Sequence, residues 1–260
     1  MLTVFRLIVM TVLSIYLSPS IAQQHVIPDF SANYQVHLNG IQAGELKRSL
    51  ESKTDGKRLF KSETQAKGIF AFFKPEIIVE TSLWHWNEST IETQSYLYSR
   101  KGGKKDKKVH LNFDWSNQRL HIDDGKQPWS LQLLPKTLDK LVYQLALMSD
   151  LANGKREFTY QIADGGKVKT YNIIILGEET VATPLGEFSA IKLLRKRERK
   201  KDRKTTLWCV PSLNYLPVQL EHIEKDGTVF TATIQTLQGI EIEASHELVE
   251  TANKSTLLQQ

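Results

Sequence analysis

The sequence predicts a mainly β protein, with an antiparallel sheet of about eleven strands that curves strongly around one central α-helix. Short runs of β-branched, aromatic and alternating apolar residues recur along the chain, separated by turn signals such as Asn39-Gly40 and Asp55-Gly56. One segment, 137–151, has convincing helical periodicity. That segment is apolar nearly all round, which indicates that the sheet wraps around it.

The first strands should form a meander. Residues 30–38 alternate in character and place Tyr34, Val36 and Leu38 on one face. The Asn39-Gly40 pair favours a type I′ hairpin turn, so residues 41–52 should pair back on the first strand. Residues 59–66 follow as a third strand after a second turn.

Residues 68–75, GIFAFFKP, carry three phenylalanines between a glycine and a proline. We consider two interpretations: a loop that plugs the core, or the rim of an apolar cavity or membrane-touching loop. The next strand, 77–86, places two tryptophans on one face. In the second interpretation the apolar, ligand-binding residues are Phe70, Phe72, Phe73, Trp84 and Trp86.

The predicted helix follows Pro135 and has Thr137 as its N-cap. Asn153-Gly154 supplies the stop signal. Apolar residues occupy one face at helical spacing: Leu138, Leu141, Val142, Leu145 and Met148. Further apolar residues lie on the other side, so we expect this helix to be the plug or lid of a curved sheet.

The stretch 181–222 combines a turn, a buried strand, a charged hairpin and two further strands. Its motifs are T-P-L-G-E-F-S-A, then T-L-W after the charged tip, then Y-L-P-V. This combination resembles the bacterial exported family called domain of unknown function 3108, best over residues 168–239. The family-motif residues are Thr183, Pro184, Gly186, Trp208, Tyr215 and Pro217. In the N-terminal half the resemblance rests on Tyr34 and the Gly40/Gly44 pair.

The resemblance implies an all-β periplasmic domain, a curved sheet or an open or half barrel similar to the outer-membrane lipoprotein carriers. It implies no reaction, because the family has none assigned.

Residues 1–22 are typical of a cleaved secretory signal. Arg6 precedes an apolar run, and Ser20 and Ala22 give an A-x-A-like cleavage site before Gln23. The apolar run, 7–17, is too short to span a bilayer, which takes roughly 20 residues. We therefore expect a soluble periplasmic protein without a transmembrane anchor after cleavage. It should consist of one β-rich domain, 23–240, and a frayed tail, 241–260.

The positive charge is concentrated in two predicted hairpin tips. The whole chain has a formal net charge of +5, yet residues 100–108 hold six basic and one acidic residue, and residues 195–204 hold eight and two. Such tips attract anionic headgroups; they also keep a long hairpin soluble and protect strand edges. The candidate anion-binding residues are Lys101, Lys104, Lys105, Lys107, Lys108, Arg195, Lys196, Arg197, Arg199, Lys200, Lys201, Arg203 and Lys204.

Catalytic and metal-binding motifs are absent from the sequence. It contains no G-x-S-x-G elbow, no H-E-x-x-H and no Walker loop, and its seven histidines have no zinc spacing. Cys209 is the only cysteine and lies between Trp208 and Val210 in a predicted strand, where burial suppresses the thiolate. We expect no enzyme activity, no metal and no cofactor. A hydrolase with a scattered site is the least favoured alternative.

Two binding functions remain. The first is a non-enzymatic carrier for an amphiphilic envelope molecule, whose partners would be anionic lipid, lipopolysaccharide or another envelope component. The alternative is an envelope assembly or interaction protein that has a filled core and binds a protein or glycan through its basic tips. A dry cavity beyond roughly 300 Å³ would favour the carrier. Export excludes nucleic acid as a partner, and the sequence leaves the oligomeric state open.

Overall fold

The structure is a computed structural model that describes residues 26–242 except 74, 104 and 197–202. Its described part forms one sheet of fifteen strands, so the prediction of about eleven strands was too low. Strands of two to four residues, such as β8 (Trp129–Gln132) and β9 (Leu138–Asp139), account for part of the difference. Such strands are too short to show the alternation on which the prediction relied. The signal, 1–22, lies outside the described residues, as does nearly all of the predicted tail.

The strands of the first half are β1 (Phe30–Leu38), β2 (Ile41–Ser52), β3 (Arg58–Ala66), β4 (Ile77–Asn87), β5 (Thr90–Lys101), β6 (Lys107–Asp114) and β7 (Arg119–Asp123). Those of the second half are β10 (Phe158–Asp164), β11 (Lys167–Thr183), β12 (Gly186–Arg195), β13 (Lys204–Val210), β14 (Leu216–Ile223) and β15 (Val229–Gln238). Two α-helices, α1 (Gly68–Phe73) and α2 (Tyr143–Ala152), and a 3₁₀ turn, Pro211–Leu213, complete the described elements.

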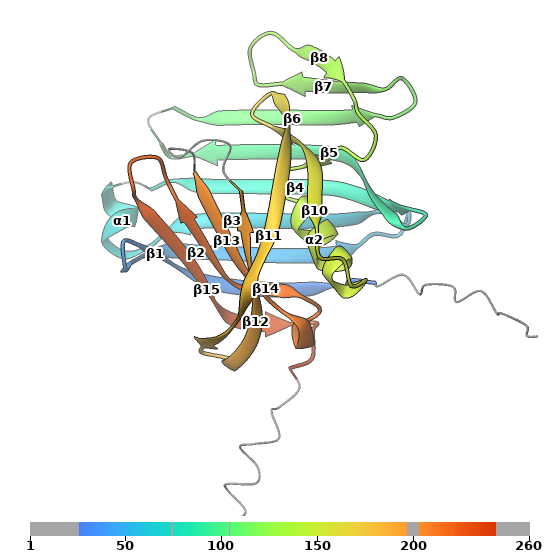
Figure 1. Cartoon of the computed structure of the whole chain (residues 1–260). Helices are drawn as coiled ribbons and strands as arrows, with labels where there is room; N and C mark the ends of the chain where they lie inside the picture. The colour runs from blue at the N-terminus through green and yellow to red at the C-terminus, as the bar shows by residue number, and fades with distance from the viewer. Residues whose placement is uncertain (1–25, 74, 104, 197–202, 243–260) are drawn as a thin grey trace, which may run out of the picture.

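The sheet is antiparallel except at one edge. Its order is β8-β7-β6-β5-β4-β3-β2-β1-β15-β14-β13-β12-β11-β10-β9, and the β9–β10 pair is parallel. The pairing of β1 with β15 joins the two halves of the chain at the middle of the sheet. Strand pairing does not close the sheet into a barrel, because β8 and β9 remain as edges. Figure 1 shows the resulting curved sheet, with β6, β7 and β8 extending beyond the curve.

The first hairpin forms as predicted. Asn39 and Gly40 both have positive φ, 48° and 82°, as a type I′ turn requires. The segment after β3 was expected to be a loop, and its first six residues instead form the short helix α1.

The central helix is shorter than predicted. It begins at Tyr143, not near Thr137, because Leu138 and Asp139 pair with β10 as β9. The Asp139 carboxylate accepts hydrogen bonds from the N–H groups of Leu141 and Val142, at 2.7 and 2.8 Å, and so caps the turn before the helix. The helix ends at Ala152, and the predicted stop residue Gly154 has a φ of 77°.

The curve of the sheet encloses α2 (Figure 1). Seven of its residues are buried, among them Leu145, Leu147 and Met148. Gln144 contacts β2 through Arg48, while the ring of Tyr143 packs edge-on against Tyr171 of β11. Side chains from both halves of the sheet and from α2 form one hydrophobic cluster, so the concave side is occupied by core side chains.

Candidate binding surface at the α1 end

Antiparallel pairing gathers several connections at one end of the sheet, which we call the α1 end. Along β1 to β6, every second connection lies at this end: the turn 39–40, helix α1 and the β5–β6 tip. The turns between them lie at the opposite end. Leu38 pairs with Phe230, which brings the β14–β15 turn to the same end. Lys204 pairs with Ile223, which adds the β12–β13 tip. Figure 1 shows α1 and the β14–β15 turn on the same side.

Helix α1 exposes apolar side chains at this end. Ile69, Phe72 and Phe73 are 67%, 85% and 77% exposed, and the two phenylalanine rings meet edge to face with centroids 5.5 Å apart. Phe70 is half-buried. The N–H of Lys67 donates to the carbonyl oxygen of Ala43 at 2.9 Å, which attaches the start of the helix to β2. The apolar patch is therefore fixed to the sheet.

The base of the first basic tip packs on the segment that follows α1. Ile77 and Ile78, which follow the helix, pair with Lys101 and Arg100 of β5. Gly102, with a φ of 78°, packs so closely on Pro75 that a Cβ would collide with the carbonyl oxygen of Pro75. The structure thus brings the basic tip to the same end of the sheet as the apolar residues of α1, although the sequence separates them by about thirty residues.

The remaining basic residues have different surroundings. Lys107 lies over the Tyr98 ring at 5.9 Å, Arg195 lies over the Tyr171 ring at 4.4 Å, and Arg203 forms a 2.6 Å ion pair with Glu224. The exposed Lys105 belongs to the β5–β6 tip, whereas Lys196 and Lys204 flank the second tip, and Lys108 lines a hollow on the outer face of the sheet. The predicted residues Lys104, Arg197, Arg199, Lys200 and Lys201 lie outside the described residues.

The five aromatic residues expected around one cavity are divided between two places. Trp84 is fully buried, and Trp86 packs on it with ring centroids 5.3 Å apart. Trp84 lies seven positions along β4 from Ile77, a distance of roughly 23 Å at 3.3 Å per residue. The exposed phenylalanines therefore lie at the α1 end, and the tryptophans lie in and against the core. Alternation identified the shared face of Trp84 and Trp86 but not their position relative to α1.

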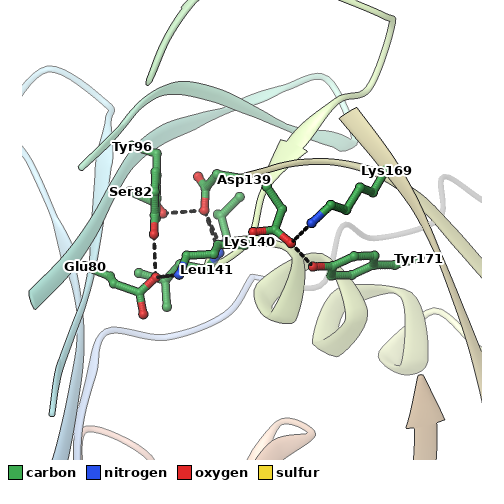
Figure 2. Close-up of polar contacts among 10 residues, drawn as sticks. Glu80, Ser82, Tyr96, Asp139, Lys140, Leu141, Lys169 and Tyr171 are labelled. Atoms are coloured by element: carbon green, nitrogen blue, oxygen red, sulfur yellow. Dashed lines mark hydrogen bonds and ion pairs between the residues drawn. The ribbon is translucent and has the colours of Figure 1, made fainter. Parts of the chain in front are cut away.

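A polar cluster joins the edge strand β9 to β4 and β5, and we call it the seam (Figure 2). Asp139 Oδ1 accepts from Ser82 Oγ at 2.8 Å, and Lys140 Nζ lies 2.8 Å from Glu80 Oε1. The hydroxyl of Tyr96 donates to the same Glu80 oxygen at 2.5 Å. By backbone pairing β9 contacts β10 alone, so these side chains hold the edge strand against β4 and β5 of the other half of the sheet.

Asp139 is the most perturbed acid of the seam. Burial raises its pKa to about 6, and the nearby charge of Glu80 acts in the same direction. Its hydrogen bonds from Val142, Ser82 and Leu141 oppose the rise. The other carboxylate oxygen, Oδ2, is buried without a hydrogen-bond partner. Asp139 could not be identified as a candidate from the sequence, because a single acid within an apolar helical pattern is usually solvent-facing.

The family-motif residues shape the backbone and anchor the sheet. Thr183 Oγ1 accepts from the N–H of Leu185 at 3.1 Å and donates to the carbonyl of Gly186 at 3.0 Å, so Pro184 lies within a tight hairpin. The Pro217 carbonyl accepts from the buried Tyr34 hydroxyl at 2.9 Å. Trp208 donates its indole N–H to Glu179, and Tyr215 has a φ of 59°.

Within the described residues, no group of three or more His, Cys, Asp or Glu side chains is arranged to hold a metal ion. Burial raises the pKa of the Cys209 thiol far above its usual range, so at neutral pH this thiol is protonated. No helix of the described part is long and apolar enough to cross a membrane.

Comparisons with known proteins identify a family and a fold. The family model described as "Protein of unknown function (DUF3108)" matches residues 33–235. Among curated proteins, no relative of this chain was found. A beta-barrel-like protein of the domain of unknown function DUF1849 from Brucella abortus has 9% identity and a TM-score of 0.53, covering 82% of this chain and 98% of its own.

A candidate lipoprotein from Parabacteroides distasonis has 10% identity and a TM-score of 0.30, covering 81% of this chain and 95% of its own. This TM-score is too low for the candidate lipoprotein to support any conclusion about the fold. The similarity to the DUF1849 protein shows that the two proteins share a fold.

Proposed function

The chain belongs to the DUF3108 family, and we propose that it is a non-enzymatic periplasmic module that binds amphiphilic, anionic-headed molecules of the cell envelope at its α1 end. The headgroup would contact the basic residues of the β5–β6 tip. The acyl chains would contact Ile69, Phe72 and Phe73 of α1. The predicted signal at residues 1–22 and the exported character of the resembled family support the periplasmic location.

One observation carries this proposal: the exposed phenylalanines of α1 and the lysines of the β5–β6 tip lie at the same end of the sheet, where the base of the tip packs on the segment that follows α1. Moving a phenylalanine from water into an apolar phase contributes about 2 kcal/mol. A lysine near an anionic membrane surface contributes about 1 kcal/mol. Neither group alone gives firm attachment, but two phenylalanines together with several lysines give reversible binding that depends on both lipid charge and ionic strength.

The packed concave side determines where an amphiphile would bind. Because Trp84 and α2 belong to the core, the acyl chain would lie on the outside of α1 and not beneath the sheet. The same packing also favours the second candidate function, an assembly or interaction protein that uses its basic tips alone. The two candidates differ in whether the phenylalanines of α1 are needed.

Vesicle flotation tests the proposal. We expect the protein to float with phosphatidylglycerol vesicles and not with phosphatidylcholine vesicles, with less binding as salt is added. The double variant Phe72→Asp/Phe73→Asp should lose most of this binding while keeping its thermal unfolding, because both side chains are exposed. The matched control is Leu134→Asp, which changes a 39% exposed leucine between β8 and β9.

Full salt-sensitive binding by the double variant would reject the amphiphile proposal and support the interaction protein. Native mass spectrometry of protein purified from its own periplasm provides a second test. A stoichiometric anionic amphiphile should accompany the wild-type chain and be lost from the double variant.

A further inference from the structure

A buried arginine of β2, Arg48, has no acid beside it. It is 7% exposed, and among the described residues it forms no ion pair. Its Nη1 donates to Gln144 Oε1 at 2.8 Å, while its Nε is buried without a hydrogen-bond partner. Arg58, the other buried arginine of the described part, donates to the Ile27 carbonyl and forms a 2.5 Å ion pair with Asp29. Because a buried charge is costly without a counter-ion, the surroundings of Arg48 are incomplete.

A second arginine, Arg195 of β12, lies on the same concave side. It is the cross-strand partner of the buried Ile173 of β11, so its side chain lies on the core face of the sheet. Its guanidinium group lies 4.4 Å from the centre of the Tyr171 ring, and it too forms no ion pair with any described residue. Because Arg195 is only half-buried, it connects this part of the concave side with the surface.

Tyr143, in the first turn of α2, links the two arginines. Its neighbour in the helix, Gln144, accepts from Arg48, and its own ring meets the Tyr171 ring edge-on with centroids 5.4 Å apart. Burial raises the pKa of the Tyr143 hydroxyl, and the charges of Arg195 and Arg48 both oppose that rise. The two guanidinium charges therefore act on the same hydroxyl.

The Tyr143 hydroxyl differs from those of the two tyrosines around it. Tyr160 donates to Asp150 at 2.8 Å, and Tyr171 donates to Asp164 at 3.0 Å. Within the described residues the hydroxyl of Tyr143 makes no hydrogen bond, and it has two arginines nearby where the others have an acid. A hydroxyl and two guanidinium groups are donors that an oxygen acceptor from outside the chain would satisfy.

The acids of the seam and of β10 already have partners of their own. Glu80 lies 2.8 Å from Lys140, and Asp164 lies 2.7 Å from Lys169. Asp139 accepts its three hydrogen bonds at the seam and in the turn before α2. The two arginines are thus left without a counter-ion among the described residues.

We propose that Arg48, Arg195 and the hydroxyl of Tyr143 bind a phosphate group on the concave side of the sheet. A guanidinium group can donate two parallel hydrogen bonds to such an oxyanion. Two guanidinium charges balance the roughly two negative charges of a free phosphate or a phosphate monoester at neutral pH. A neutral ligand would leave both charges uncompensated. The site is separate from the exposed residues of α1 and does not rest on the function proposed for them.

An NMR titration of the full mature chain with inorganic phosphate, at constant ionic strength, tests the site. Phosphate should shift the amide signals of Tyr143 and Gln144 saturably, with a Kd below about 10 mM. Arg195→Gln should weaken binding at least about tenfold and Tyr143→Phe about fivefold, because each removes a donor to the anion. The matched control is Lys192→Gln, which removes a cation of the same strand that pairs with Glu179, and it should bind as the wild type does.

Dihexanoyl phosphatidic acid distinguishes the two sources of the phosphate group. Shifts of the same amides at lower concentrations of this lipid than of inorganic phosphate would assign a lipid headgroup, and the reverse order would assign the free anion. Shifts that do not saturate with either probe, or that persist unchanged in Arg195→Gln, would overturn the proposal. The Phe72→Asp/Phe73→Asp variant should keep its phosphate binding, so failure of this site and failure of the α1 surface are separate results.

Discussion

A buried carboxylate, that of Asp139, connects the edge strand β9 to β4, in the other half of the sheet. Its Oδ1 accepts three hydrogen bonds, one from Ser82 and two from the turn before α2, while Oδ2 has none. Because burial raises its pKa from 3.8 to about 6, the folded state binds a proton more tightly than the unfolded chain. This residue therefore contributes stability that is present below pH 4 and is lost as the pH rises towards 6.

Asp139→Asn should remove that dependence. The amide keeps an acceptor for the three donors and cannot ionise, and any cost of its unpaired N–H₂ is the same at every pH. Between pH 4.5 and 7.5 the variant should gain about 2 kcal/mol in free energy of unfolding relative to the wild type. Urea unfolding of both proteins at the two pH values measures this difference, and equal differences at both would contradict the assigned role.

A single hydrogen bond of Tyr34 also connects the two halves of the chain. Its buried hydroxyl donates to the Pro217 carbonyl at 2.9 Å, so a tyrosine of β1 is tied to the Y-L-P-V motif of β14. Burial raises the pKa of this hydroxyl to about 12, so it remains a donor at neutral pH. Tyr34→Phe would leave a buried acceptor unpaired and should lower the free energy of unfolding by about 1–3 kcal/mol. An unchanged urea midpoint would show that the contact is not stabilising.

At the scale of elements, the position of the β5–β6 tip depends on Gly102. Gly102 and Gly125 have nearly the same φ, 78° and 80°, but only a Cβ on Gly102 would meet another part of the chain. Both alanine variants should pay about 1 kcal/mol for the left-handed backbone. Gly102→Ala should lose more stability than Gly125→Ala and should also bind phosphatidylglycerol vesicles more weakly, because the tip moves away from α1. Equal effects of the two variants in urea unfolding and flotation would reject this account.

Elements governed by local chemistry could be predicted from the sequence. Asn39-Gly40 specifies its turn through positive φ, and alternation located β1, β6 and β15. The start of α2 could not be predicted, because the competing structure at Leu138 and Asp139 is a parallel pairing with β10 that only the folded sheet provides. The candidate site could likewise be predicted only in part. Composition identified the basic tips and Phe72, but the separation of Trp84 from α1 depends on distance along β4, which composition does not show.

At the scale of the whole molecule, charge and shape act together. The two basic tips carry more positive charge than the whole chain, so the remaining surface is net acidic. Register brings both tips to the α1 end, and the resulting asymmetry should turn that end towards an anionic surface.

The most direct test of the central claim is site-specific labelling with an environment-sensitive fluorophore. Cys209 is fully buried with a protonated thiol, so a cysteine introduced at Phe72 or Leu134 is the accessible labelling site in the described part of the chain. With phosphatidylglycerol vesicles, the label at position 72 should shift to the blue and brighten, and the label at 134 should not change. The same response at both positions, or none at 72, would contradict binding through the α1 end.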